Sequence, residues 1–217
     1  MIFDLDGTLV DSEPLSEDAW RRLLAKFDYT VTREDVLSTH GRAYSDIHSY
    51  FAERAPVPEP ESLWKLYAEI LFPSMDERLP IFRDAIATAL ALKQAGVKLG
   101  LASSSPRARV DYTLTRTALH ELFTVTVAGD EIRHGKPAPD LFLEVARRLQ
   151  VAPARCVAIE DSQPGVDAAH AAGMRVVGLV RPDATGLNGA TLLTEELSFE
   201  LVSRLLRGDP DGCVGEK

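Results

Sequence analysis

The chain has 217 residues, of which 45% are hydrophobic and 26% are charged, and its formal net charge at pH 7 is −9. This composition is typical of a globular protein, and the length suits one large domain or one domain that carries an insertion. No apolar run approaches the roughly 20 residues that span a bilayer, and no signal peptide is visible. No basic patch predicts nucleic-acid binding. We therefore expect a cytoplasmic protein that binds neither membranes nor nucleic acids.

The first residues predict a strand that runs directly into a polar loop. Met1, Ile2 and Phe3 are apolar, and the segment DLDGT follows from Asp4. Only three residues precede Asp4, whereas strands average about five to six residues. Because this strand should be central in its sheet, we expect a natural start upstream that lengthens it. The alternative is that the neighbouring strands are equally short at that end.

The next part of the chain predicts helices without strands. Ser16 can cap one helix, and the acidic residues after Thr32 fit the first turn of another. Helices are predicted over 16–27, from 32 onward, over 44–54 and over 60–75. We interpret residues 12–78 as a helical insertion, or cap.

From about residue 80 strands and helices alternate. Strands are predicted over 97–102, 124–128, 156–159 and 175–180, the last strand, and helices over 85–95, 106–118, 139–150, 164–172 and 199–207. This alternation implies a parallel sheet covered by helices on both faces, and right-handed crossovers make it doubly wound. The predicted fold is therefore α/β: a five-stranded, Rossmann-like core (1–11 and 79–217) with the cap inserted.

Polar side chains follow the predicted strands, at the edge where ligands bind in such folds. They are Asp4, Asp6, Ser103, Glu160 and Asp161. Asp4 and Asp6 are two residues apart and share a face, so their carboxylates repel unless a cation lies between them or one holds a proton. Magnesium, which prefers oxygen ligands, is the common choice near phosphates.

Four segments resemble the motifs of the haloacid dehalogenase superfamily. They are FDLDGTLVDS from Phe3, LASSS around Ser103, GKPAPD around Lys136 and EDSQPG from Glu160. All four occur in order, and the match covers nearly everything outside 12–78. The helical insertion resembles the first cap class of this family, as in β-phosphoglucomutases and small sugar-phosphate phosphatases.

The resemblance implies a role for each core residue. Asp4 would be the nucleophile that forms an aspartyl-phosphate, and Asp6 the general acid and base. Lys136 would pair with the phosphoryl oxygens and with Asp4. Magnesium would be held by Asp4, the main-chain carbonyl of Asp6 and Asp161. Glu160 would be either a further ligand through water or an orienting group for Lys136.

Substrate contacts are also implied by the resemblance. Ser103, with the backbone amide of Ser104, would donate hydrogen bonds to the phosphate oxygens. A serine after a strand is often a helix N-cap, a task that Ser104 or Ser105 could take here. Arg42, in a loop of the cap, could hold a distal group of the substrate, although a solvated loop arginine is an equal alternative.

The predicted function is that of a magnesium-dependent phosphatase of small phosphorylated metabolites, with sugar phosphates as the leading class, acting as a monomer or weak homodimer. A sugar phosphomutase is the first alternative, but Ser16 and Tyr44 stand where β-phosphoglucomutases have a histidine and an arginine. A haloalkanoate dehalogenase would need neither Asp6 as a proton donor nor magnesium. A non-enzymatic receiver module also pairs aspartates with a lysine, but it is much shorter and has no cap.

Overall fold

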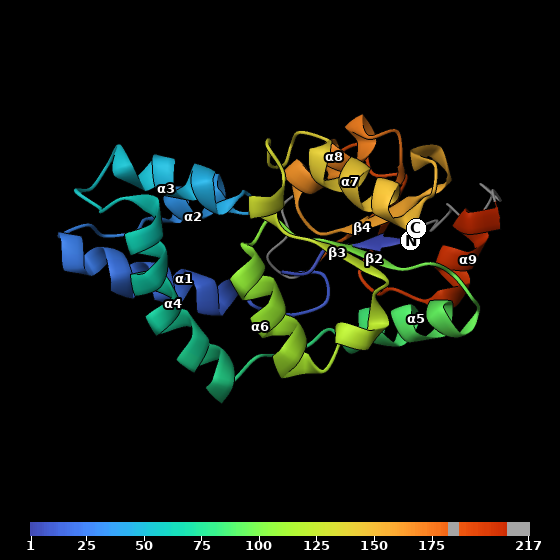
Figure 1. Ribbon diagram of the computed structural model, residues 1–217, viewed down its shortest axis with the longest axis horizontal. Coiled ribbons are helices and arrows are strands. Elements are labelled where there is room, and N and C mark those ends of the chain that lie inside the picture. Colours follow the sequence, from blue (N-terminus) through green and yellow to red (C-terminus); the bar gives the residue numbers. More distant parts are fainter. Residues whose placement is uncertain (182–186, 208–217) are drawn as a thin grey trace, which may run out of the picture.

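A parallel β-sheet with helices on both faces forms the larger part of the protein (Figure 1). The computed structural model describes residues 1–181 and 187–207. The strands are β1 (Ile2–Phe3), β2 (Gly100–Ala102), β3 (Val125–Val127), β4 (Val157–Glu160), β5 (Arg175–Leu179) and β6 (Leu192–Thr194). Their order is β3-β2-β1-β4-β5-β6, and each neighbouring pair is parallel. The predicted doubly wound α/β fold is confirmed.

The predicted number of five strands is wrong, because β6 adds a sixth strand beside β5. The prediction that residues 175–180 form the last strand fails for the same reason. Strand β6 has only three residues, it lies at the edge of the sheet, and Leu193 at its centre is 51% exposed. It therefore lacks the continuous buried apolar run by which the inner strands can be recognised.

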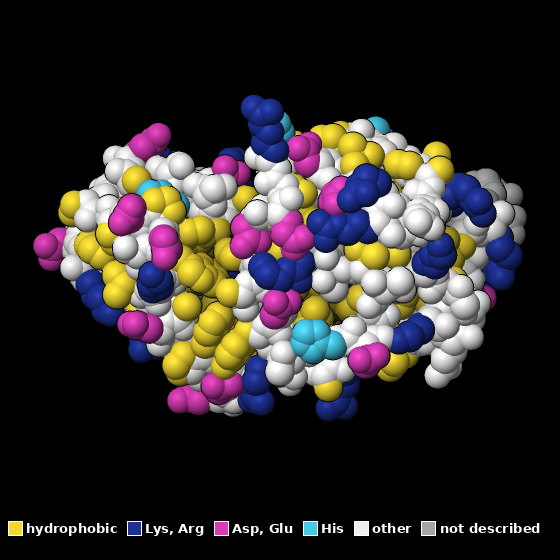
Figure 2. Space-filling model, in the orientation of Figure 1, with side chains coloured by type: hydrophobic (Ala, Val, Ile, Leu, Met, Phe, Trp, Pro, Cys, Tyr) yellow, Lys and Arg dark blue, Asp and Glu magenta, His cyan; other side chains and the backbone are white. Residues whose placement is uncertain are grey.

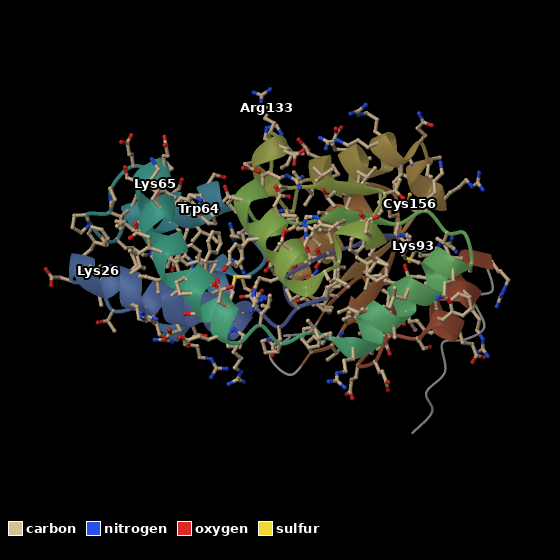
Figure 3. The ribbon with its side chains drawn as sticks, turned by 60° about the horizontal axis from the view of Figure 1, so that its bottom comes forward. Lys26, Trp64, Lys65, Lys93, Arg133 and Cys156 are labelled. Carbon is tan, nitrogen blue, oxygen red and sulfur yellow. The ribbon has the colours of Figure 1, made fainter. Side chains whose placement is uncertain are left out.

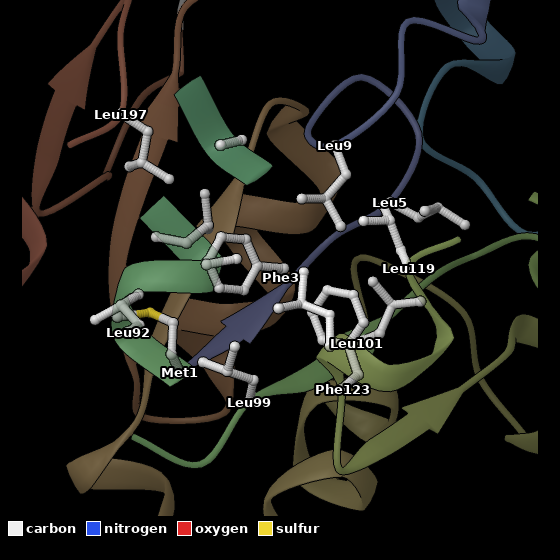
Figure 4. Packing of buried hydrophobic residues seen from close by; sticks show 14 of the residues in the cluster. Met1, Phe3, Leu5, Leu9, Leu92, Leu99, Leu101, Leu119, Phe123 and Leu197 are labelled. Carbon is white, nitrogen blue, oxygen red and sulfur yellow. The ribbon is translucent and has the colours of Figure 1, made fainter. Parts of the chain in front are cut away.

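The helices cover the two faces of the sheet separately. Helices α7 (Asp140–Leu149) and α8 (Gln163–Ala171) pack on one face, and α5 (Arg83–Gln94), α6 (Arg107–Thr117) and α9 (Phe199–Arg207) contribute to the cluster on the other. Successive strand residues point to opposite faces, so Ile2 belongs to the first cluster and Phe3 to the second. Figure 4 shows Phe3 and Phe123 in this second cluster, where their rings meet edge to face at 6.1 Å.

Strand β1 is central, as predicted, and pairs with β2 and β4. The amino group of Met1 donates a hydrogen bond to the carbonyl of Lys98 at 2.9 Å, and the amide of Gly100 donates to the carbonyl of Met1 at 2.9 Å. Burial lowers the pKa of this amino group. The neighbouring strand β2 begins only at Gly100, and the expected upstream start stays a prediction.

Four helices form a group at the other end of the molecule, on the left in Figure 1. They are α1 (Glu13–Leu24), α2 (Arg33–Thr39), α3 (Tyr44–Ala52) and α4 (Pro60–Glu77). Thr32 and Asp35 form a capping box at the start of α2, which confirms the predicted start of this helix. Helix α1 begins at Glu13 rather than at Ser16, because Pro14 is well suited to the first turn.

These helices have a core of their own. Its fully or nearly buried members are Ala19, Trp20, Leu23, Leu24, Val31, Phe51, Leu63, Tyr67, Ile70, Leu71 and Met75. Figure 2 shows hydrophobic side chains gathered over this part of the viewed face, while charges of both signs are spread more widely. In the described part of the chain no helix is both long and apolar enough to cross a membrane.

Candidate active site

A buried lysine and two carboxylates meet beyond the carboxyl end of the central strand. The amide of Asp4 donates to the carbonyl of Ile159 at 3.0 Å, which ties the end of β1 to β4. The ammonium of Lys136 forms ion pairs with Asp4 and Glu160, and Lys136 is only 2% exposed. Burial alone would lower the pKa of Lys136, but the two carboxylates outweigh it and raise the pKa.

Glu160 has both carboxylate oxygens engaged within the protein. One contacts Lys136, and the other accepts hydrogen bonds from the amides of Asp161 at 3.0 Å and Ser162 at 3.1 Å, and from the Ser162 hydroxyl at 3.0 Å. A Cβ on Gly165 would lie 1.9 Å from this carboxylate, so the glycine leaves room for it. Of the two roles considered for Glu160, this geometry favours orientation of Lys136.

Asp161 lies against the turn that follows β1. Its carboxylate accepts a hydrogen bond from the hydroxyl of Thr8 at 3.0 Å. Gly7 has a φ of +79°, and a Cβ there would lie 1.9 Å from Asp161 Oδ2. On the other side, Nε2 of His40 lies 4.0 Å from the same oxygen. The first and fourth motifs therefore meet directly, as the shared sheet edge predicts.

The region carries more negative charge than Lys136 can balance. Burial raises the pKa of Asp4 well above its usual range, and Glu160 raises it further although Lys136 opposes the shift. Burial and the neighbouring carboxylates Glu160 and Asp4 raise the pKa of Asp161 in the same way. Such an excess of buried carboxylate is the setting in which a divalent cation binds.

Magnesium fits this donor set. Among the described residues no three His, Cys, Asp or Glu side chains form a metal-binding group by themselves. However, the predicted set combines the carboxylates of Asp4 and Asp161 with the main-chain carbonyl of Asp6. Magnesium is usually held by one or two carboxylates together with substrate phosphate and water, so these residues suffice.

Asp6 has a separate set of partners. Its Oδ1 accepts hydrogen bonds from the Ser12 hydroxyl at 2.6 Å and from Nη2 of Arg109 at 2.8 Å, and its Oδ2 from Ser105 at 2.8 Å and Ser103 at 3.4 Å. Burial would raise the pKa of Asp6, but the Arg109 charge and the hydrogen bonds from Ser12 and Ser105 lower it overall. These contacts hold the carboxylate in one place, away from the ion pair of Lys136.

The serine hydroxyls of the second motif contact different partners. Ser103 is completely buried. Its hydroxyl accepts a hydrogen bond from the amide of Ser105 at 3.1 Å and donates one to Asp6. The Ser104 hydroxyl donates to the carbonyl of Gly41 at 3.1 Å, which links the core to the loop between α2 and α3. Neither Ser104 nor Ser105 caps α6, because Pro106 occupies the N-cap position without a side-chain hydrogen bond.

A pocket with about 850 Å³ of empty space, part of it open to solvent, joins the core to the four helices. Asp4, Lys136 and the exposed Arg42 are among its lining residues. On the helical side the lining is mostly aromatic and aliphatic: Trp20, Val31, Val36, Tyr44, Ile47, Phe51, Trp64 and Tyr67. In Figure 3 Trp64 lies on the side of the helical group that is nearer the core, whereas Lys26 lies at its far end.

The balance of charge in the pocket lining differs from that of the whole chain. The lining holds three carboxylates and three cations, Asp4, Asp6, Glu13, Arg42, Arg109 and Lys136, together with His40. The complete chain has a net charge of −9. The charges of these lining side chains therefore balance, whereas the chain as a whole is acidic, so an anionic substrate meets less repulsion here.

Arg109 is a lining residue that sequence reasoning missed. It lies on the buried face of α6 with Val110, Thr113 and Leu114. Residues three and four apart share a helix face, so an arginine among these side chains interrupts an otherwise core-facing stripe. That interruption, in the first turns of a helix that follows a motif strand, is the signal that could have identified it.

Comparison with known proteins gives the family. Residues 1–179 match the family model described as haloacid dehalogenase-like hydrolase. The chain therefore belongs to the haloacid dehalogenase-like hydrolases, and the resemblance of the four motifs is confirmed. The predicted enzyme class, a phosphatase of this type, is confirmed as well.

Individual relatives are similar over most of the chain. A phosphorylated carbohydrates phosphatase from Thermotoga maritima is 32% identical, over 93% of each chain. A bifunctional riboflavin kinase/FMN phosphatase from Arabidopsis thaliana is 33% identical over 82% of this chain, but the match spans only 48% of that longer protein. Among solved structures, β-phosphoglucomutase from Clostridium difficile superposes with a TM-score of 0.83, at 25% identity, covering 95% of this chain and 96% of that one.

Proposed function

We propose that the chain is a magnesium-dependent phosphatase of small phosphorylated metabolites, sugar phosphates foremost, that works through an aspartyl-phosphate at Asp4. The observation that carries this proposal is the buried ion pair of Asp4 with Lys136 at the end of the central strand, on the wall of an open pocket. A carboxylate so placed can attack phosphorus, and the lysine can neutralise the charge that gathers there.

The reaction balances in two steps. In the first, a carboxylate oxygen of Asp4 attacks phosphorus, the bond from phosphorus to the ester oxygen breaks, and Asp6 in its protonated form gives its proton to the leaving alkoxide. In the second, a water attacks the phosphorus of the aspartyl-phosphate, Asp6 takes a proton from that water, the bond from phosphorus to the Asp4 oxygen breaks, and phosphate leaves. Asp6 thereby returns to the form in which it began.

Lys136 and Glu160 form a supporting pair. The ammonium of Lys136 would hold the phosphoryl oxygens close to Asp4, against their mutual repulsion. Glu160 is fully buried and keeps Lys136 in place from the other side. The phosphoryl group would also accept hydrogen bonds from the second-motif loop, with the hydroxyl of Ser103 and the backbone amide of Ser104 as donors. Ser104 lines the pocket, and its own hydroxyl donates to the carbonyl of Gly41.

Asp4, the main-chain carbonyl of Asp6 and Asp161 are the residues that would hold magnesium. When bound, the ion supplies positive charge that offsets the phosphoryl group and the two carboxylates. The raised pKa values of Asp4 and Asp161 support this assignment, because both carboxylates gain from a neighbouring cation.

Residues 12–78 would act as the cap that encloses the leaving group. Trp64 is half-buried and lines the pocket, so the C–H face of a sugar ring could pack on its ring, and Arg42 could contact a distal polar group. The T. maritima relative is named as a phosphatase of phosphorylated carbohydrates, which supports the same substrate class.

A sugar phosphomutase is the second candidate, favoured by the structural match to β-phosphoglucomutase. Two contacts argue for the phosphatase instead. The Ser16 hydroxyl is hydrogen-bonded to the hydroxyl of Tyr67 at 2.8 Å, and the Tyr44 hydroxyl donates to the carbonyl of Pro60 at 2.8 Å. Both groups are thus engaged in holding the helices together, and neither resembles the cationic group expected at these positions in a mutase.

A panel of phosphorylated metabolites tests the proposal. With magnesium present, sugar phosphates should release inorganic phosphate, and a hexose 1-phosphate should do so without its 6-phosphate isomer appearing. Isomer formation that outpaces phosphate release, in the presence of a bisphosphate activator, would establish the mutase instead. If no phosphomonoester in the panel is turned over, the proposed function is wrong.

A further inference from the structure

A buried arginine connects the general acid and base to the four helices. Arg109 is only 7% exposed. Its Nη2 donates to Asp6 at 2.8 Å and to the Ser12 hydroxyl at 3.2 Å, and its Nη1 lies 3.4 Å from the hydroxyl of Tyr67 in α4. The Tyr67 hydroxyl in turn shares a hydrogen bond with Ser16 of α1 at 2.8 Å. One chain of contacts therefore runs from Asp6 to two helices of the cap.

Stability does not explain why an arginine occupies this position. Its helical neighbours Val110 and Leu114 pack into the apolar cluster beneath the sheet. Replacing a buried ion pair with apolar side chains of similar volume is often neutral or even stabilising. An apolar residue at position 109, matched by one at position 6, would thus serve packing at least as well, and a functional reason for the pair is needed.

Arg109 also differs from the other groups that hold Asp6. The remaining donors are the hydroxyls of Ser12, Ser103 and Ser105, which are neutral and can rotate. Among the described residues Arg109 is the one charged donor to Asp6, and its planar guanidinium presents donors in a rigid fork. Without it, Oδ1 of Asp6 keeps only the Ser12 hydroxyl, and nothing charged fixes the carboxylate.

We infer that Arg109 is a positioning residue for the proposed reaction: it fixes the side chain of Asp6 and ties that position to the docked cap through Tyr67. This inference rests on the function proposed above. A general acid must lie within hydrogen-bonding reach of the oxygen that it protonates, and a misplacement of about 1 Å can cost on the order of 10²-fold in rate. The role therefore concerns the chemical step and not substrate affinity.

A double-mutant cycle with Asp6 tests the inference, using a sugar phosphate that the wild-type enzyme hydrolyses. Arg109→Met should lower kcat by about 10- to 100-fold and change KM by less than about threefold, since only the chemical step is affected. Asp6→Asn should lower kcat by roughly 10²–10⁴-fold. In the Asp6→Asn background, Arg109→Met should cost less than about threefold more, because the group that Arg109 positions is already lost.

Two further variants separate positioning from a general effect on the fold. Arg109→Lys keeps the charge but loses the planar set of guanidinium donors. Its kcat should lie between those of Arg109→Met and the wild type. If Arg109→Met does not fold, the same cycle is measured with Arg109→Lys. Arg116→Met is the matched control: Arg116 also joins α6 to α4, through an exposed ion pair with Asp76 at 3.0 Å, but it does not touch Asp6, and its kcat should stay within about threefold of wild type.

The outcomes are distinct. Equal fold-losses from Arg109→Met in the wild-type and Asp6→Asn backgrounds would overturn the inference, and so would a raised KM with unchanged kcat. A wild-type enzyme that releases no phosphate from any phosphomonoester would instead refute the proposed function, whatever the variants do.

Discussion

Two buried cations stand on the wall of the same pocket, and they differ in what they are connected to. Lys136 pairs with Asp4 and Glu160, and all three belong to the core. Arg109 pairs with Asp6 but also reaches Tyr67 in the cap. The proposed nucleophile and its partners are therefore held by the core alone, whereas the proposed general acid and base is held by the core and the proposed cap together.

This difference indicates how the proposed chemistry can be divided. The first step needs a nucleophile in a fixed place before the substrate arrives, and a group held only by core residues such as Asp4 meets that need. Proton transfer has to fit the leaving group, which the cap encloses. Because Arg109 contacts both Asp6 and Tyr67, the position of the Asp6 carboxylate depends on where the cap lies.

The largest effect should come from the nucleophile. Asp4→Asn removes the attacking oxygen, and we expect no measurable release of phosphate from any substrate. The melting temperature should not fall, because burial already disfavours the charged form of Asp4. The matched control is Asp18→Asn, which alters an exposed pair with Arg22 and should keep full activity. Substantial turnover by Asp4→Asn would show that another residue is the nucleophile.

Removal of magnesium by a chelator should abolish phosphate release as the loss of Asp4 does. Excess chelator should abolish phosphate release, and added magnesium should restore it, because the neighbouring carboxylates of Asp4 and Asp161 repel one another and an anionic substrate unless a cation lies between them. Steady-state assays with and without chelator measure this directly. Unchanged activity in excess chelator would contradict the proposed metal site.

Removal of the core cation should affect stability as well as activity. Lys136→Met leaves Asp4 and Glu160 buried without their common partner, which should cost on the order of 3–5 kcal/mol in the free energy of unfolding. Urea unfolding measures this loss, and phosphate release should disappear too. Lys65→Met is the control, since it breaks an exposed pair with Glu61 and should leave stability nearly unchanged. A Lys136→Met protein as stable as wild type would show that the carboxylates are neutralised in another way.

The core half of this comparison could be predicted from the sequence. Short apolar strands that end in Asp4, Ser103 and Glu160 identify the edge of the sheet where the motifs meet, because parallel strands carry their carboxyl ends to the same side. The loop residue Lys136 was found through the motif resemblance, since nothing in its local sequence shows that it is buried.

The other half could not be predicted, for a physical reason. The partner of Asp6 is 103 residues away in the sequence, and its identity depends on how α6 docks against the cap. Strand β6 was missed because edge strands with exposed side chains, such as Leu193, carry little hydrophobic pattern.

The smallest expected effect tests the link between the two halves. Tyr67→Phe removes the hydroxyl that joins Arg109 to Ser16 and leaves the ring in place. A neutral hydrogen bond contributes about 0.5–1.5 kcal/mol, and about 1.36 kcal/mol corresponds to a tenfold change in rate. We therefore expect kcat to fall by no more than about tenfold, because Arg109 keeps its direct contact with Asp6.

The control for this change crosses the same boundary between core and cap. The Tyr112 hydroxyl of α6 donates to the carbonyl of Phe72 in α4 at 3.3 Å, and the rings of these two residues stack at 4.1 Å. Tyr112→Phe therefore weakens cap docking by one comparable hydrogen bond without touching Arg109. If both variants lower the melting temperature alike but only Tyr67→Phe lowers kcat, the cap acts on Asp6 through Arg109. Equal losses of kcat in both variants would mean that any weakening of the cap has the same result, and that the Tyr67 contact has no particular role.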